Sequence, residues 1–153
     1  MPGDEADALA YRCAEALAHR CAEAMWAEDH ASRGLGMVLG AVAAGSATLS
    51  LLVRPDMVNG HGLCHGGFIF TLADSAFAFA CNSYGERCVA HHNEITFVRP
   101  GRQGETLTAT AEERVRAGRS GIYDVRVTGS DGTIVAEMRG HSRMIGKRFF
   151  AED

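Results

Sequence analysis

The stretch from Gly66 to Cys81 constrains the fold of this chain most. It reads GGFIFTLADSAFAFAC, and Asp74 is its only charged residue. A helix that is apolar on nearly every side must be covered on all of them. The stretch is shorter than the roughly 20 residues that a bilayer crossing needs, and a carboxylate interrupts it. It therefore predicts a buried core helix rather than a membrane span.

Strand patterns lie on both sides of this helix. Two short apolar runs, Met37–Ala43 and Ala47–Val53, flank Gly45 and predict a hairpin. After Cys88 alternation replaces the helical period and predicts four more strands. Their turns fall at Pro100-Gly101, at Gly118 to Gly121 and at Ser130-Asp131-Gly132. The order predicts an α+β fold, in which a curved six-stranded antiparallel sheet wraps around the apolar helix.

The N-terminal region is rich in alanine and has a helical period. Apolar residues recur every four positions along one side: Leu9, Cys13, Leu17, Cys21 and Met25. This spacing predicts one amphipathic helix or two between Ala6 and Arg33, ended by Gly34 and Gly36. We therefore divide the chain into an N-terminal helical extension (1–33), one sheet-and-helix domain (34–148) and a short tail (149–153).

Charge and cysteine content exclude some classes of function. Fifteen Lys and Arg against nineteen Asp and Glu give a net charge of −4, without the long basic run that binding to nucleic acid favours. The five cysteines form no C-x-x-C pair, and Asp4, Glu5 and Asp7 lie where a secretory signal would be apolar. These features predict a cytoplasmic protein with no nucleic-acid or membrane partner.

Asp74 is the first candidate catalytic residue. A carboxylate among Leu72, Ala73 and Phe77 loses hydration, which raises its pKa and costs several kcal/mol if it is unpaired. Such groups concentrate at active sites, where they act as general bases. The alternative is a structural role, with Asp74 hydrogen-bonded to a loop amide or to a neighbouring subunit.

His65, Gly66 and Gly67 open the same helix. The first amides of a helix lack intrahelical partners and lie at the positive end of its dipole. Without a side chain, Gly66 can present its N–H to a substrate oxygen, as an oxyanion hole requires. The alternative is that the two glycines only make the sharp turn from loop to helix.

The spacing between these two candidates predicts an oligomer. Gly66 and Asp74 are eight positions apart, which is about 12 Å along one helix. Two groups so far apart cannot both act on one carbonyl. If two copies pair with their helices antiparallel, Gly66 of one faces Asp74 of the other, which gives two sites per symmetric dimer.

Other motifs carry weaker signals. His61 and His65 flank Cys64 in a composition that zinc accepts, but the glycine-rich loop lacks the helical register of a zinc motif, and we predict no metal site. The cysteines have no base at a suggestive spacing and resemble small buried hydrophobes. His91 and His92 begin a strand, so their side chains are expected on opposite faces.

The motifs around Asp74 resemble those of the hotdog-fold acyl-CoA thioesterases, most closely the phenylacetic-acid-degradation (PaaI) branch. The pattern N-x-x-G-x-x-H-G-G begins at Asn59, and F-T-L-A-D-S-A-F-A follows from Phe70. An F-x-R-P motif at Phe97 and a late Gly140-His141-Ser142 add to the resemblance. It extends over residues 28–146.

The resemblance implies roles for individual residues. The residue aligned with Asp74 acts as general base or nucleophile, and the amide aligned with Gly66 polarises the thioester carbonyl from the other protomer. Dimers of this kind commonly pair again to tetramers, and no cofactor is implied. Further positions match substrate-binding ones: Asn59 and His65 border the reacting group, Gly67 continues the motif, and Ser75 helps to hold water or the acyl group. Relatives carry an Asn near the end of the first helix, where this chain has Glu28 and Asp29.

The predicted function is hydrolysis of an aryl-CoA or arylacetyl-CoA thioester. Arg119 and Arg99 are candidates for binding coenzyme A phosphates, with solvated surface arginines as the alternative. Four aromatic residues are candidates for the acyl pocket or for the core: Phe68, Phe77, Phe79 and Phe97. The alternative functions are hydrolysis of other short or medium acyl-CoAs, hydration or dehydration of an acyl-CoA, and non-catalytic acyl-CoA sensing. A hydratase usually needs Asp-x-x-x-x-His, and here Phe79 stands at the His position.

Overall fold

The computed structural model describes residues 2–151 and has the predicted architecture. Its elements follow in the order α1 (Pro2–Glu28), α2 (His30–Gly34), β1 (Val38–Ala43), β2 (Ser46–Leu52), η1 (Pro55–Met57), α3 (Gly66–Cys81), β3 (Glu86–Phe97), β4 (Thr106–Ala117), β5 (Ser120–Thr128) and β6 (Ile134–Arg148). The six strands form one antiparallel sheet, and the α+β prediction is confirmed.

The strand order gives the sheet one long unpaired edge. The order is β1-β2-β4-β5-β6-β3, so β4, β5 and β6 form the successive hairpins that their turns predict. Strand β3 precedes them in the chain but pairs with β6. Its other side has no strand partner within the described residues. The 12 residues of β3 therefore form an edge of the sheet.

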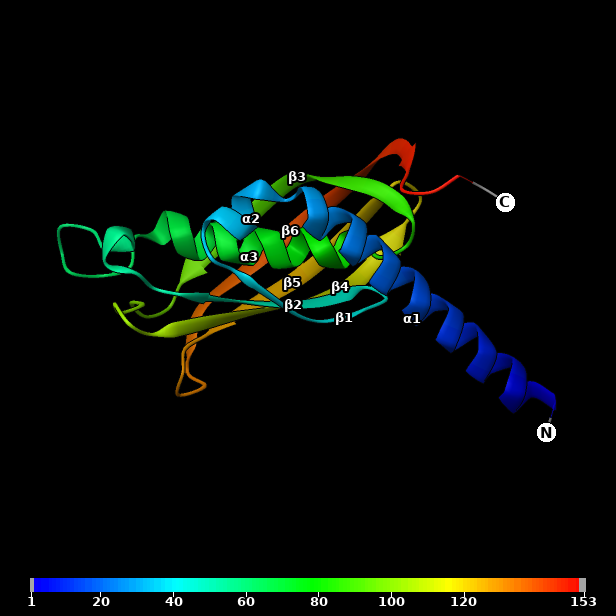
Figure 1. Cartoon of the computed structure of the whole chain (residues 1–153), viewed down its shortest axis with the longest axis horizontal. Coiled ribbons are helices and arrows are strands. Elements are labelled where there is room, and N and C mark those ends of the chain that lie inside the picture. Colours follow the sequence, from blue (N-terminus) through cyan, green and yellow to red (C-terminus); the bar gives the residue numbers. More distant parts are fainter. Residues whose placement is uncertain (1, 152–153) are drawn as a thin grey trace.

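Helix α3 lies across the curved sheet, and α2 and the C-terminal part of α1 lie beside it (Figure 1). Half of its residues are buried, among them Leu72, Ala73 and Ala76, which have no exposed surface. The prediction of an enclosed apolar helix is therefore confirmed. No helix among residues 2–151 is long and apolar enough to span a membrane.

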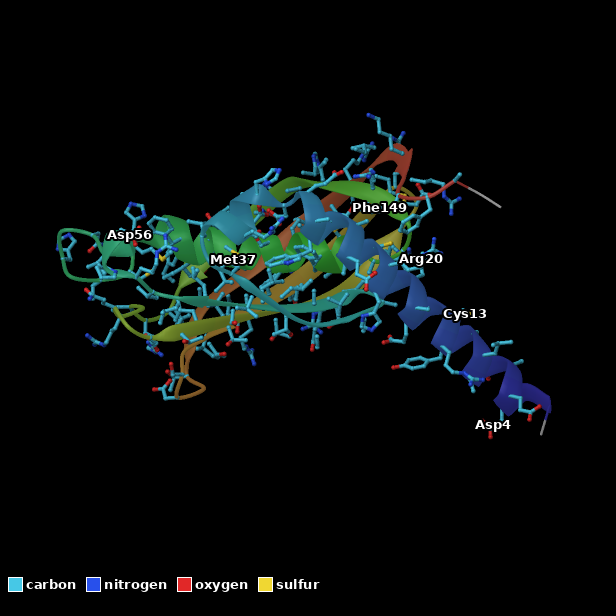
Figure 2. All side chains as sticks on the ribbon, in the orientation of Figure 1. Asp4, Cys13, Arg20, Met37, Asp56 and Phe149 are labelled. Atoms are coloured by element: carbon cyan, nitrogen blue, oxygen red, sulfur yellow. The ribbon has the colours of Figure 1, made fainter. Side chains whose placement is uncertain are left out.

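The N-terminal region forms two helices that meet at Asp29. The carboxylate of Asp29 accepts a hydrogen bond from the Ser32 amide at 2.9 Å and caps the start of α2. Ala18 and Cys21 are buried, so the second half of α1 belongs to the core. The first half, with Asp4 and Cys13, projects beyond the sheet (Figure 2).

The segment predicted as a tail packs back on the domain as far as Ala151. The Phe149 amide donates to the Gly85 carbonyl at 3.0 Å. The guanidinium of Arg87 lies 4.3 Å from the centre of the Phe149 ring, and that of Arg20 lies equally far from the Phe150 ring. Residues 152 and 153 of the predicted tail lie outside the described residues, as does residue 1 of the extension.

A β-bulge changes the alternation of β3. The register of β3 against β6 shifts between Ala90 and His92. After the shift Asn93 pairs with Gly140, and a Cβ on Gly140 would lie 2.8 Å from the Phe77 ring, so this pair of positions faces α3. His92 and His141 form the next pair and face the outer side, with ring centres 5.4 Å apart.

Candidate active site

The carboxylate of Asp74 lies in the middle of α3, on the side that faces β3. The Asn93 side-chain nitrogen donates to Oδ1 of Asp74 at 2.7 Å. Burial raises the pKa of Asp74 above its usual value, and the hydrogen bond from Asn93 partly opposes this rise. The second carboxylate oxygen has no hydrogen-bond partner within residues 2–151. One oxygen of the Asp74 carboxylate is thus held by Asn93, and the other is available to a further partner.

The loop before α3 is held by Asn59. Its side-chain oxygen accepts hydrogen bonds from the amides of His61 at 2.9 Å and Leu63 at 3.2 Å. Gly62 has a φ of 72°, a left-handed conformation that favours glycine, and its amide donates to the Asn59 carbonyl. Both loop amides use the side-chain oxygen, and the Asn59 side-chain nitrogen has no hydrogen-bond partner within residues 2–151.

His65 caps the start of α3. Its Nδ1 accepts a hydrogen bond from the Gly67 amide at 2.9 Å. An imidazole that accepts at Nδ1 is neutral and carries its proton on Nε2. The Gly66 amide has no hydrogen-bond partner among the described residues, and it lies at the positive end of the helix dipole. Of the two glycine amides, that of Gly66 is the one open to a substrate oxygen.

A groove of about 340 Å³ lies beside this amide. Its walls come from the loop before α3, from the start of α3 and from the end of β3: Asn59, Leu63, Cys64, Gly66, Ile69, Phe97, Val98, Arg99 and Pro100. The Phe97 ring lies against Gly66, because a Cβ at Gly66 would be 3.0 Å from its nearest ring atom. Phe97 is 50% exposed, so its ring also forms part of the groove surface.

Both candidate groups lie along the edge strand β3. Gly66 contacts Phe97, and Asp74 contacts Asn93, so α3 and β3 run in opposite directions here. The eight residues of continuous helix between Gly66 and Asp74 span about 12 Å. Within one chain the two groups therefore lie too far apart to act on the same carbonyl.

Ser75, predicted to hold water or the acyl group, has a partner in α2. Its hydroxyl lies 2.8 Å from that of Ser32, and Ser32 is buried. This contact links α2 to α3. The Asp29 cap of α2 holds Ser32 in place, so this chain uses the end of its first helical region to pack α3.

The two candidate arginines lie in different settings. Arg99 forms ion pairs with Glu105 at 2.7 Å and with Asp131 at 3.2 Å. Its guanidinium is therefore bound to carboxylates of the loops at one end of the sheet. Arg119 donates to the Met144 carbonyl at 3.0 Å and lies near Cys81. Within one chain it is thus at the opposite end of α3 from Gly66.

Three of the four aromatic candidates separate into core and groove, and the fourth, Phe68, is partly buried with its ring centre 6.2 Å from that of His65. Phe77 packs against Tyr123 with ring centres 5.6 Å apart, and Phe79 packs against Trp26 at 6.0 Å. Phe77 and Phe79 are each 1% exposed and belong to the core. Phe97 is the aromatic candidate that lines the groove.

Cys64 is the thiol nearest to the open amide. Burial raises the pKa of Cys64, which keeps the thiol protonated and weakens it as a nucleophile. Within residues 2–151 no three His, Cys, Asp or Glu side chains come together as a metal site would require.

A curved six-stranded antiparallel sheet wrapped around one long helix is the hotdog fold. The chain belongs to the thioesterase superfamily, whose family model matches residues 61–136. Its fold and reaction class agree with the resemblance in the sequence motifs, and both predictions are confirmed.

Proteins of the PaaI type are similar to this chain over most of its length. The chain is 43% identical to acyl-coenzyme A thioesterase PaaI of Escherichia coli K12 over 122 residues, which cover 80% of this chain and 87% of that protein. The solved E. coli PaaI structure matches with a TM-score of 0.86 and 41% identity, over 88% of this chain and 97% of that one. A mutant of the Thermus thermophilus phenylacetic acid degradation protein PaaI matches with a TM-score of 0.74 and 35% identity, over 76% and 100%. Streptococcus mutans smu.793, solved bound to acetyl CoA, matches with a TM-score of 0.71 and 26% identity, over 73% and 90%.

Proposed function

We propose that this protein hydrolyses an aryl-CoA or arylacetyl-CoA thioester to the free acid and coenzyme A. The observation that carries the proposal is the partly buried Asp74 carboxylate, with one free oxygen, on the helix whose first amide is open at Gly66. The similarity to PaaI, whose E. coli structure is described as coming from the phenylacetic acid degradation operon, supports the arylacetyl class. The Phe97 ring in the groove suits an aromatic acyl group.

The residues present suffice for the chemistry. Asp74 takes a proton from water, the water oxygen bonds to the thioester carbon, and the carbon–sulfur bond then breaks. The Gly66 amide stabilises the negative charge that develops on the carbonyl oxygen. The proton on Asp74 passes to the departing thiolate, which restores the carboxylate. No cofactor is required because a thioester carbonyl is already electrophilic.

Three further residues surround the reacting group in this proposal. Asn59 contributes its free side-chain nitrogen as a donor, and His65 contributes the proton on Nε2. Gly67 keeps the start of the helix free of a side chain, since a Cβ there would be 3.0 Å from the His65 ring. Arg119 lies near the C-terminal end of α3. In the proposed dimer it is the candidate that binds a phosphate of coenzyme A whose thioester is held at Gly66 of the other copy.

The proposed active unit is a homodimer formed through the edge strand β3. This strand has no strand partner on its outer side within the described residues, and exposed Val89, Phe97 and Val98 lie along it or directly after it. An unpaired edge with apolar side chains favours pairing with another strand. A two-fold axis near Ile95, midway between Asn93 and Phe97, would bring Gly66 of one copy opposite Asp74 of the other. We further propose that two such dimers pair into a tetramer. The proposed location is the cytoplasm, and no nucleic-acid or membrane partner is proposed.

Mixed dimers test whether the site is shared. Asp74→Asn and Gly66→Ala each impair both sites of a homodimer, but a dimer of one chain of each kind would keep one intact site. Refolding the two variants together should restore about a quarter of wild-type activity, because half of the dimers are mixed and each has one working site. Activity that stays at the level of the separate variants would contradict a site shared between subunits.

A panel of acyl-CoAs tests the reaction. Free thiol release should be fastest with phenylacetyl-CoA, hydroxyphenylacetyl-CoA or benzoyl-CoA, and slower with acetyl-CoA and hexanoyl-CoA. Turnover restricted to the aliphatic substrates would favour a thioesterase of other specificity. Binding without thiol release would favour a sensor, and addition of water to an enoyl-CoA would favour a hydratase.

A further inference from the structure

Only one of the two polar atoms of the Asn93 side chain has a hydrogen-bond partner among the described residues. Its nitrogen donates to Asp74 at 2.7 Å, but its oxygen is buried and has no hydrogen-bond partner among the described residues. It is the one buried side-chain polar atom of this kind within residues 2–151. Buried carbonyl oxygens almost always accept a hydrogen bond, so this atom points to a donor that binds there.

The bulge in β3 is the reason that Asn93 faces Asp74. Before the bulge Ala90 pairs with Ser142, and after it His92 pairs with His141. In a regular ladder His92 would pair with Gly140 and face α3, and Asn93 would face the outer side. The extra residue reverses the alternation and turns Asn93 inward. Bulges commonly redirect a side chain at a functional site.

We infer that Asn93 is a positioning residue of the hydrolytic site, which orients the Asp74 carboxylate and accepts a hydrogen bond from the water that Asp74 activates. This inference rests on the proposed thioester hydrolysis. The water would donate one hydrogen to the free Asp74 oxygen and the other to the Asn93 oxygen. Its lone pair is then left to bond to the thioester carbon, while the proton held by Asp74 passes to the thiolate when the carbon–sulfur bond breaks.

The surroundings make Asp74 sensitive to Asn93. The pKa of Asp74 responds to burial first and to the hydrogen bond from Asn93 second, and no charged side chain adds to these two effects. Titratable groups that face inward around α3 include the buried thiols of Cys21, Cys64 and Cys81, the thiol of Cys88 and the phenol of Tyr123, which donates to the Glu113 carboxylate. Glu94 and its partner Arg139 face the outer side of the sheet, and α2 contributes the uncharged Ser32.

The test compares Asn93→Asp and Asn93→Ala with Glu112→Gln, a control at an exposed position on the outer face of β4, away from the proposed dimer strand. For each, kcat and KM for thiol release from the best acyl-CoA of the panel are measured against pH, with the melting temperature as a check of folding. Asn93→Asp keeps the shape but replaces the donor by a second carboxylate, so the rise of kcat with pH should move up by about one pH unit or more. Asn93→Ala should move it in the same direction, because Asp74 loses the donor that favours its charged form. Both should lower kcat at pH 7 about tenfold with little change in KM, as loss of one charge-assisted hydrogen bond predicts.

Glu112→Gln should keep the wild-type kcat and pH profile. Folded Asn93 variants with wild-type kcat and pH dependence would overturn the inference while the thioesterase proposal stands. A lower kcat without a shift in the pH profile would also overturn it, since that result indicates packing alone. A wild-type protein that releases no thiol from any acyl-CoA would overturn both proposals.

Discussion

Nδ1 of His65 accepts a hydrogen bond from the Gly67 amide at 2.9 Å. This contact caps α3 with a side chain and consumes one of the amides that open the helix. The neighbouring Gly66 amide keeps its direction because the first turn is held in place. His65 thus stabilises the start of α3 and, by the same hydrogen bond, helps to orient the proposed oxyanion donor.

Two replacements of His65 should show how much its hydrogen bond to the Gly67 amide contributes to stability. His65→Ala removes the acceptor, and loss of a cap costs about 1 kcal/mol, or roughly 2 to 4 °C in melting temperature for a chain of this size. His65→Asn keeps a good capping residue and should melt near the wild type. Thermal unfolding followed by circular dichroism measures both. Equal melting temperatures for His65→Ala and wild type would show that the cap contributes little.

The contact between Gly66 and Phe97 gives a second prediction. A Cβ at position 66 would lie 3.0 to 3.4 Å from three atoms of the Phe97 ring, so the ring or the helix start must shift. Gly66→Ala should lower kcat about tenfold to a hundredfold by misplacing the amide donor. Gly66→Ala combined with Phe97→Ala should recover part of that loss because the clash is gone. Kinetics of both variants and of Phe97→Ala alone decide this, and a double variant no better than Gly66→Ala would contradict it.

Much of the fold could be predicted because its signals are local. The apolar run from Gly66 to Cys81 predicts α3 within a residue, and Asp74 is identifiable as its single acid. Turn residues such as Ser130-Asp131-Gly132 predict the β5–β6 hairpin. The pairing of β3 with β6 was not predictable in this way, because it joins segments separated by two other strands.

The site was less predictable where it depends on nonlocal contacts. Alternation counted forward from Cys88 places Asn93 on the outer face, and alternation counted back from Ile95 places it on the inner face; the bulge after Ala90, which the sequence does not reveal, resolves this conflict in favour of the inner face. The ion pairs of Arg99 join two loops, the one between β3 and β4 that holds Arg99 and Glu105 and the one between β5 and β6 that holds Asp131, and no local pattern predicts the second contact. No local pattern predicts the contact of Ser75 with Ser32 either.

Asp74→Asn should stabilise the fold in a pH-dependent way. Burial raises the pKa of Asp74, so the folded chain holds this proton more tightly than the unfolded chain, in which an aspartate pKa is about 3.9. Protonated Asp74 therefore stabilises the folded chain fully at a pH below the unfolded-state pKa. This stabilisation is lost as the pH rises through the raised pKa of the folded state. Asp74→Asn should therefore melt above wild type at about pH 8 and close to it at about pH 4. A difference in melting temperature that does not change with pH would contradict a desolvated carboxylate.

The hydroxyl pair of Ser32 and Ser75 gives a prediction that separates packing from catalysis. Ser75→Ala leaves the buried Ser32 hydroxyl without its partner, which costs about 1 to 3 kcal/mol. Ser32→Ala with Ser75→Ala should cost less than Ser75→Ala alone, because no buried hydroxyl is left unpaired. If the hydroxyl serves packing, kcat stays within about twofold of wild type. A lower kcat at an unchanged melting temperature would instead assign Ser75 to the water or the acyl group.

The rate of thiol release by Asp74→Asn tests the central claim most directly. The amide keeps the size of the side chain and can still accept the hydrogen bond from Asn93, but it cannot take a proton from water. With phenylacetyl-CoA as substrate, and with the assembly checked by size-exclusion chromatography, kcat should fall by about a hundredfold or more, the usual contribution of a general base. An intact assembly that turns over at the wild-type rate would contradict the assignment of Asp74 as the group that activates water.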